Sequence, residues 1–167
     1  MNEGGHASAE RAAMTGFPEA HCRVIASRSL EDDAYVLLDT GSPRHPHLYG
    51  VNCFQRAGQW FERGSSDGPG WEQTGHDPDV GTLSLWADVP GDVDFVRVNF
   101  NGALIEEPVN HAAYLMVWWR IAQPTQWPHV VAVRAHGTWT TESDVGLALR
   151  VAVERGHVPG LSNREHG

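Results

Sequence analysis

Short segments that alternate apolar and polar residues, each bounded by turn residues, recur along most of this chain and constrain its fold more than any other feature. Such period-two segments are typical of β-strands with one buried face, because successive side chains point to opposite faces. The segments are 23–27, 34–39, 47–56, 59–63, 82–88, 94–100, 103–109, 113–121, 129–135 and 138–141. Their spacing of about one strand per dozen residues predicts an all-β fold, an antiparallel β-sandwich of about 8 to 10 short strands.

Two-residue turns between consecutive segments indicate how the strands pair. Asn101-Gly102 lies between Phe100 and Ala103, where a type I′ turn needs two positive φ values, and His136-Gly137 joins the last two segments. Ala57-Gly58 is a weaker signal of the same kind. Each turn predicts an antiparallel hairpin, and no helix is required before residue 140.

The length of the chain suits one ordinary domain. It has 167 residues, 41% of them hydrophobic and 20% charged, which is enough to bury a core. We expect a disordered tail over 1–20, a β-sandwich domain over 21–141 and a separate segment over 142–167. Within that last segment, 145–153 alternates like a strand, but its composition and the cap-like spacing before it favour a short helix, followed by a tail.

No targeting or membrane signal is visible in the sequence. The first twenty residues lack a basic start followed by an apolar run, and the most apolar stretch, 112–119, is far shorter than the roughly 18 residues that a membrane-spanning helix needs. We therefore expect a cytoplasmic protein that does not bind membranes. The two cysteines, Cys22 and Cys53, are then expected to be reduced.

The charge of the chain bears on its partners. Its net charge is −9, and no basic residue occurs between Arg63 and Arg97. The carboxylates chosen there as a candidate acidic flank are Asp67, Asp77, Asp79, Asp92 and Asp94. Proteins that bind nucleic acid need the opposite balance, since Lys and Arg neutralise phosphates, so nucleic acid is excluded and a basic protein partner fits better.

Several turn and tryptophan motifs occur in a recognisable order. They are CFQRAGQWFERGSSDGPGW from Cys53 to Trp71, then LSLW, VRVNFNG, PVNHAAYLMVWW and VVAVRAHGTW. In this order the chain resembles small uncharacterised, immunoglobulin-like β-sandwich proteins of GC-rich bacteria over roughly residues 22–140. The resemblance implies the sandwich fold, and the group has no assigned activity that could be carried over.

The sequence offers little catalytic or metal-binding signal. His45 and His47 flank a proline, with Cys53 further along the same strand, but such loop histidines are ordinarily solvated and no further ligand can be chosen. Ser65 and Ser66 lack the surroundings of a nucleophile elbow or a phosphate loop, and the stretch around them is expected to be an ordered loop pinned by Trp71. We expect neither a metal nor another cofactor, and no catalytic residue can be named.

Tryptophan is the most informative residue type, with seven copies in the chain. In the segment 113–121, the alternation predicts one set of side chains toward the core, and we assign Leu115, Val117 and Trp119 to it. The remaining set forms, with a tryptophan of the segment 82–88, a predicted outward aromatic strip: Trp86, Tyr114, Met116 and Trp118. Such a strip suits a binding surface, although another segment of the chain folding over it explains the same residues equally well.

These features rank three classes of function. The first is a non-catalytic interaction module that binds a protein partner through the acidic flank and the aromatic strip. The second is a β protein that binds a small molecule or carbohydrate, with Trp86 and Trp118 as stacking platforms. The third is an enzyme with an unidentified site.

Overall fold

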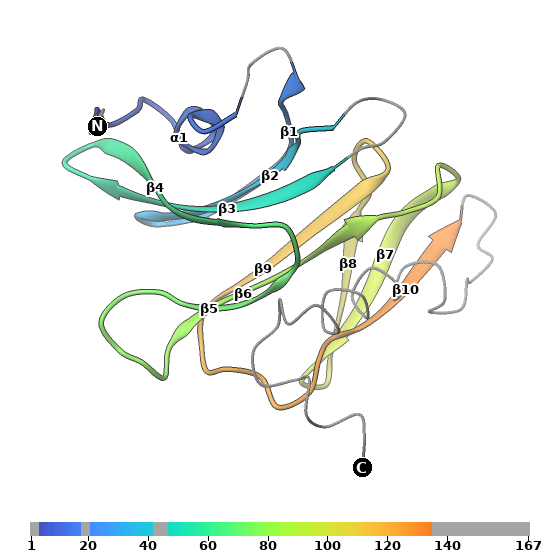
Figure 1. The fold of residues 1–167 in the computed structure, drawn as a ribbon. Helices are drawn as coiled ribbons and strands as arrows, with labels where there is room; N and C mark the ends of the chain where they lie inside the picture. The colour runs from blue at the N-terminus through green and yellow to red at the C-terminus, as the bar shows by residue number, and fades with distance from the viewer. Residues whose placement is uncertain (1–3, 18–20, 42–46, 135–167) are drawn as a thin grey trace. The chain divides into compact units, whose positions relative to one another are not determined.

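A computed structural model describes residues 4–17, 21–41 and 47–134. Strands dominate these residues, and every paired strand runs antiparallel to its neighbours, which confirms the predicted all-β class (Figure 1). The chain divides into two compact units, one ending at Asp67 and the other beginning at Gly68, where the sequence predicted one domain over 21–141. Each unit has its own cluster of buried residues.

The first unit is a four-stranded sheet with a helix on one face. The strands, in sheet order, are β1 (Arg23–Leu30), β2 (Asp33–Asp39), β3 (Leu48–Arg56) and β4 (Gln59–Ser66). Helix α1 (Ala9–Met14) packs against this sheet (Figure 1). The buried residues between them, called here the helix-side cluster, are Ala9, Ala12, Ala13, Ala34, Val36, Leu38, Val51 and Cys53.

Helix α1 corrects the prediction of a disordered tail over 1–20 without a helix. Ser8 caps the helix, since its hydroxyl oxygen accepts a hydrogen bond from the Arg11 backbone N–H at 3.3 Å. Its buried face consists of alanines at helical spacing, which carry little hydrophobic signal in a sequence but allow close packing on a sheet. None of the described helices is long and apolar enough to cross a membrane.

The second unit consists of two three-stranded sheets. One has the order β10 (His129–Arg134), β7 (Val93–Phe100), β8 (Ala103–Pro108), and the other β5 (Gly70–Gln73), β6 (Gly81–Asp88), β9 (Ala113–Ile121). Both sheets contribute to one buried cluster, called here the sandwich core, as expected for the predicted sandwich. Its members on the strands are Leu83, Leu85, Ala87, Val93, Val96, Val98, Phe100, Tyr114, Met116, Val130 and Ala132.

Two of the predicted hairpin turns fall within the described residues, and both form as predicted. Asn101 and Gly102 have φ values of 51° and 79°, and Phe100 pairs with Ala103. Ala57 and Gly58 have φ values of 51° and 76° at the end of the β3–β4 hairpin. The predictions for His136-Gly137, for 138–141 and for 142–167 lie outside the described residues.

The stretch from Gly64 to Gly70 was predicted to be an ordered loop, but β4 extends to Ser66 and β5 begins at Gly70. Strand β5 pairs with β6 from Gly70 opposite Ser84 to Gln73 opposite Gly81. Trp71 holds it in place, because its indole N–H donates a hydrogen bond to the Ile121 backbone carbonyl at 3.1 Å. The prediction that Trp71 pins this stretch therefore agrees with the structure, but as part of a sheet.

Candidate functional site

The predicted aromatic strip is not an exposed surface. Met116 and Tyr114 belong to the sandwich core, and Trp118 packs against it with its ring 5.0 Å from that of Phe100. Tyr114, Met116 and Trp118 therefore face the core of their own unit, although the prediction placed them outward. The alternation could not decide this, because both sets on β9 are apolar.

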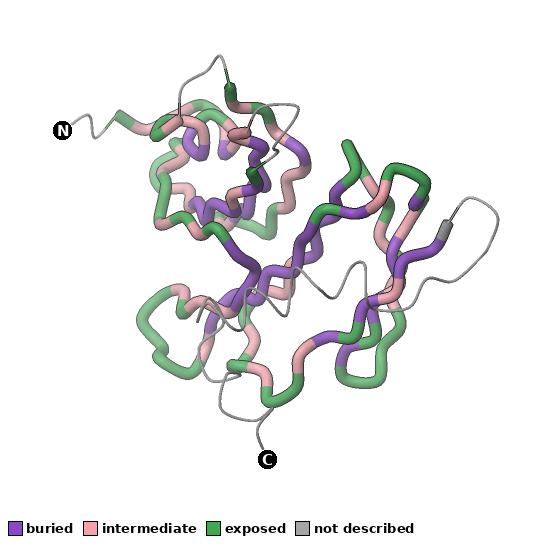
Figure 2. The backbone as a smooth tube through the Cα atoms, turned by 45° about the vertical axis from the view of Figure 1, so that its right-hand side comes forward, coloured by how far each residue is buried: buried purple, intermediate pink, exposed green. Residues whose placement is uncertain are grey.

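Trp86 lies on the other face of the same sheet. Its backbone pairs with Leu115, whereas Trp118 pairs with Leu83, so the two tryptophans point to opposite faces. Trp86 is only 4% exposed, so it offers no stacking platform either. Figure 2 shows where buried and exposed residues lie along the backbone of each unit.

The residues of the predicted acidic flank are all exposed, but they do not form one patch. Asp77 and Asp79 lie in the loop before β6, and an Asp77 carboxylate oxygen accepts a hydrogen bond from the Asp79 N–H at 2.9 Å. Asp92 and Asp94 lie beyond the other end of β6, roughly 20 Å away for a strand of this length. Asp67 precedes β5.

The histidine and cysteine residues considered for metal binding are also separated. Cys53 is buried in the helix-side cluster, and its thiol approaches the Ala9 carbonyl at 3.6 Å. His47 lies six residues earlier, roughly 20 Å away along an extended chain, and its ring packs on Tyr49. Among the described residues, no three His, Cys, Asp or Glu side chains are grouped as metal ligands, and His45 lies outside them.

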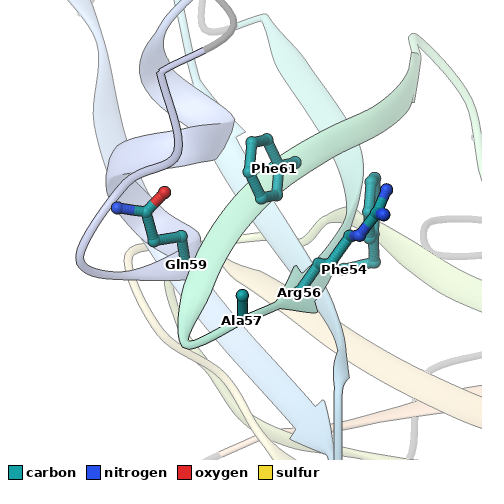
Figure 3. A pocket seen from close by; sticks show the side chains of 5 residues that line it. All are labelled: Phe54, Arg56, Ala57, Gln59 and Phe61. Carbon is teal, nitrogen blue, oxygen red and sulfur yellow. The ribbon is translucent and has the colours of Figure 1, made fainter.

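A hollow of about 480 Å³ lies on the β3–β4 hairpin (Figure 3). It is lined by Phe54, Arg56, Ala57, Gln59 and Phe61. The hairpin register explains this set, since Phe54 pairs with Phe61 and Arg56 with Gln59 on either side of the Ala57-Gly58 turn. Two consecutive cross-strand pairs at alternate positions place all four side chains on one face of the sheet.

A ladder of contacts holds the phenylalanine rings of the hollow. The Phe54 and Phe61 rings stack with centroids 5.5 Å apart and planes inclined by 25°. The guanidinium of Arg63 lies 5.3 Å from the centroid of Phe54, and it is fixed in turn by an ion pair with Asp33 at 3.0 Å. The rings are only partly buried, so this arrangement presents a fixed aromatic surface to solvent.

The amino-terminal segment forms part of the surroundings of the hollow. His6 pairs with Trp60 through two backbone hydrogen bonds of 2.8 Å, which place Gly5 beside β4. A Cβ atom at Gly5 would lie 2.5 Å from the Gln59 side chain and 2.8 Å from the ring of Phe61. Gly5 therefore allows the segment to approach two lining residues closely.

Arg56 is the charged group of the hollow. Within the described part of the chain, no carboxylate pairs with its guanidinium, whereas Arg23, Arg63 and Arg97 pair with Asp39, Asp33 and Glu106. The arrangement can thus offer one cation, one amide and two aromatic rings to a bound molecule.

The predicted Ala57-Gly58 turn was the one sequence signal of this site, since a two-residue hairpin fixes which of its side chains share a face. The predicted binding surface was centred on Trp86 and Trp118, whereas no tryptophan lines the hollow. The chain is a small, mostly β protein with several antiparallel sheets. No protein-family model, curated protein or solved structure matches it.

Proposed function

We propose that this chain is a non-catalytic binding module and that the hollow on the β3–β4 hairpin is its binding site for a small molecule. One observation carries the proposal: two stacked, half-exposed phenylalanine rings lie beside an arginine that has no carboxylate partner among the described residues. The Arg56 side chain is exposed, so its guanidinium is accessible to a bound molecule.

The character of the hollow also supports a small ligand. Small-molecule sites have volumes of roughly 300 to 1,000 Å³ and combine apolar walls with a few polar groups that orient the ligand. The hollow lies within this range, with the phenylalanine rings as walls and Arg56 and Gln59 as polar groups. Its shape is held in advance by the type I′ turn and by the ladder from Asp33 to Phe61, which lowers the entropic cost of binding.

The protein-partner function remains the second candidate, with less support than the sequence suggested. Burial of Trp86, Tyr114 and Met116 removes the aromatic contact surface on which it rested. The exposed aspartates remain, and charge of this kind accelerates association more than it strengthens a complex. From the resemblance to bacterial immunoglobulin-like sandwich proteins we also propose that the chain belongs to that fold family. The resemblance does not indicate a ligand.

A fragment screen by NMR tests the proposed function. The backbone amides of the full, ¹⁵N-labelled chain are followed while small aromatic and polar compounds are added. We expect the compounds that bind to shift the amide resonances of residues 54–61. The Phe61→Leu substitution should weaken the binding of these compounds. Phe95→Leu is the matched control, since Phe95 is also a half-buried strand residue beside an arginine but lies in the second unit. Shifts confined to other residues, or none, would contradict the proposal.

A further inference from the structure

The charge balance of the hollow restricts what it can bind. Of the two arginines near the rings, Arg63 is committed to Asp33, whereas Arg56 lines the hollow without a carboxylate partner in the described residues. The site therefore offers a single uncompensated positive charge. A guanidinium presents paired N–H donors that match a carboxylate in a fork-like arrangement.

The neighbouring groups define the rest of the ligand. Gln59 pairs with Arg56 across the hairpin, but its amide points away from the guanidinium, toward the amino-terminal segment at Gly5 (Figure 3). The next cross-strand pair is Phe54 with Phe61, whose rings favour offset or edge contacts with another flat ring. Along the strands, the polar pair at the turn is followed directly by the aromatic pair.

We propose, as a refinement that rests on the proposed function, that the hollow binds a small aromatic carboxylate. Its carboxylate pairs with the guanidinium of Arg56, and its ring packs against Phe54 and Phe61. Consecutive pairs on one face of a hairpin are separated by roughly 7 Å along each strand, and the Arg56 side chain extends toward Phe54 (Figure 3), so one small molecule can contact both.

Other anionic ligands fit this site less well. A phosphate group carries close to two negative charges and is bound in proteins by several cations or by a series of backbone N–H groups. The lining supplies one uncompensated arginine. Nucleic acid is disfavoured further by the net charge of −9, which repels a polyanion.

The test compares three probes of similar size by NMR titration of the full chain: benzoate, its neutral analogue benzamide, and cyclohexanecarboxylate, which keeps the charge but lacks the flat ring. We expect benzoate to shift the amides of residues 54–61 in a saturable manner, with about tenfold lower Kd than either analogue, because each lacks one of the two contacts.

Two variants assign the contacts. Arg56→Gln should raise the Kd of benzoate about tenfold and leave that of benzamide unchanged. Arg11→Gln is the matched control, since it removes the same charge from an exposed residue of the first unit outside the hollow, and it should change neither Kd. Spectra of both variants without ligand show whether they remain folded.

The outcomes separate the two proposals. If benzamide binds to residues 54–61 as tightly as benzoate, or if Arg56→Gln leaves benzoate unaffected, the aromatic carboxylate is the wrong ligand class and the hollow remains a binding site. If cyclohexanecarboxylate equals benzoate, the aromatic part of the inference is wrong. If no compound perturbs residues 54–61 in this titration or in the fragment screen, both proposals fall.

Discussion

At the scale of single residues, a buried hydroxyl lowers the stability of the second unit. Tyr114 is 1% exposed within the sandwich core, and its hydroxyl has no hydrogen-bond partner among the residues that the structure describes. Burial raises the pKa of this phenol well above its ordinary value, since the charged form would lose its solvation entirely. The hydroxyl thus carries a desolvation cost that no hydrogen bond within the described part of the chain offsets.

Removal of this hydroxyl should stabilise the protein. We expect Tyr114→Phe to raise the free energy of unfolding by about 1 kcal/mol or more, because the ring and its packing remain while the unpaired group disappears. Urea denaturation measures the change. Tyr49→Phe, at a half-buried tyrosine in contact with Phe17 and His47, should change stability by less than about 0.5 kcal/mol. A loss of stability in Tyr114→Phe would show that the hydroxyl does have a partner in solution.

The two cysteines, both free thiols, differ in their surroundings. Burial raises the pKa of Cys53 from 9.0 to about 12, with nearby Glu62 and Glu10 adding to the effect. Burial also raises the pKa of Cys22, which is partly exposed. Because alkylation needs the thiolate and access to it, we expect iodoacetamide to modify Cys22 well before Cys53 at pH 8 in the folded protein. Peptide mass spectrometry resolves the two rates; equal rates that persist without unfolding would contradict the burial of Cys53.

The raised pKa of Cys53 also has a consequence for stability. In the unfolded chain the thiol ionises near pH 9, whereas in the folded protein it stays protonated to about pH 12. The contribution of this group to stability is therefore fully present below pH 9 and is lost as the pH rises from 9 toward 12. We therefore expect the Cys53→Ala variant to lose less stability between pH 9 and pH 12 than the unsubstituted protein loses.

At the scale of elements, helix α1 belongs to the fold of the first unit. Ala13 is fully buried in the helix-side cluster, whereas Arg11 on the same helix is exposed. We expect Ala13→Asp to lower the free energy of unfolding by roughly 3 kcal/mol, because it buries a carboxylate among apolar groups. Arg11→Asp introduces the same residue at the exposed position and should change stability by less than about 0.5 kcal/mol. Equal effects in thermal denaturation would indicate that the helix does not pack on the sheet.

The β3–β4 hairpin can be tested through its turn. Gly58 has a φ of 76° with open space around it, so Gly58→Ala should cost about 1 kcal/mol through backbone strain alone. Gly64, on β4 of the same hairpin, also has open space but no left-handed φ, so Gly64→Ala should be close to neutral. Chemical denaturation of both variants measures the difference. If both substitutions are neutral, the type I′ turn that shapes the hollow is not formed.

At the scale of the whole molecule, the period-two pattern predicted the long strands well. Strand β9 has the predicted bounds, and β3 and β7 differ from theirs by one residue. The four-residue strand β5 was missed because it lies within a turn-rich stretch. Helix α1 was missed because six residues with an alanine face give too little periodicity.

The candidate site was harder to predict than the strands, for a physical reason. Local alternation states which residues share a face, but not which face another element covers. This is why Tyr114, Met116 and Trp118 were placed outward, although they face the sandwich core. Where a tight turn fixed the register, as between Arg56 and Gln59, the sequence did contain the set of residues that lines the hollow.

Ligand binding at the β3–β4 hairpin can be located by intermolecular NOEs. In a complex of the full chain with benzoate, we predict NOEs from the ring protons of benzoate to the ring protons of Phe54 and Phe61, with none to the aromatic residues of the second unit. NOEs to Phe95, Trp118 or Trp127 in place of those to Phe54 and Phe61 would contradict binding at the β3–β4 hairpin.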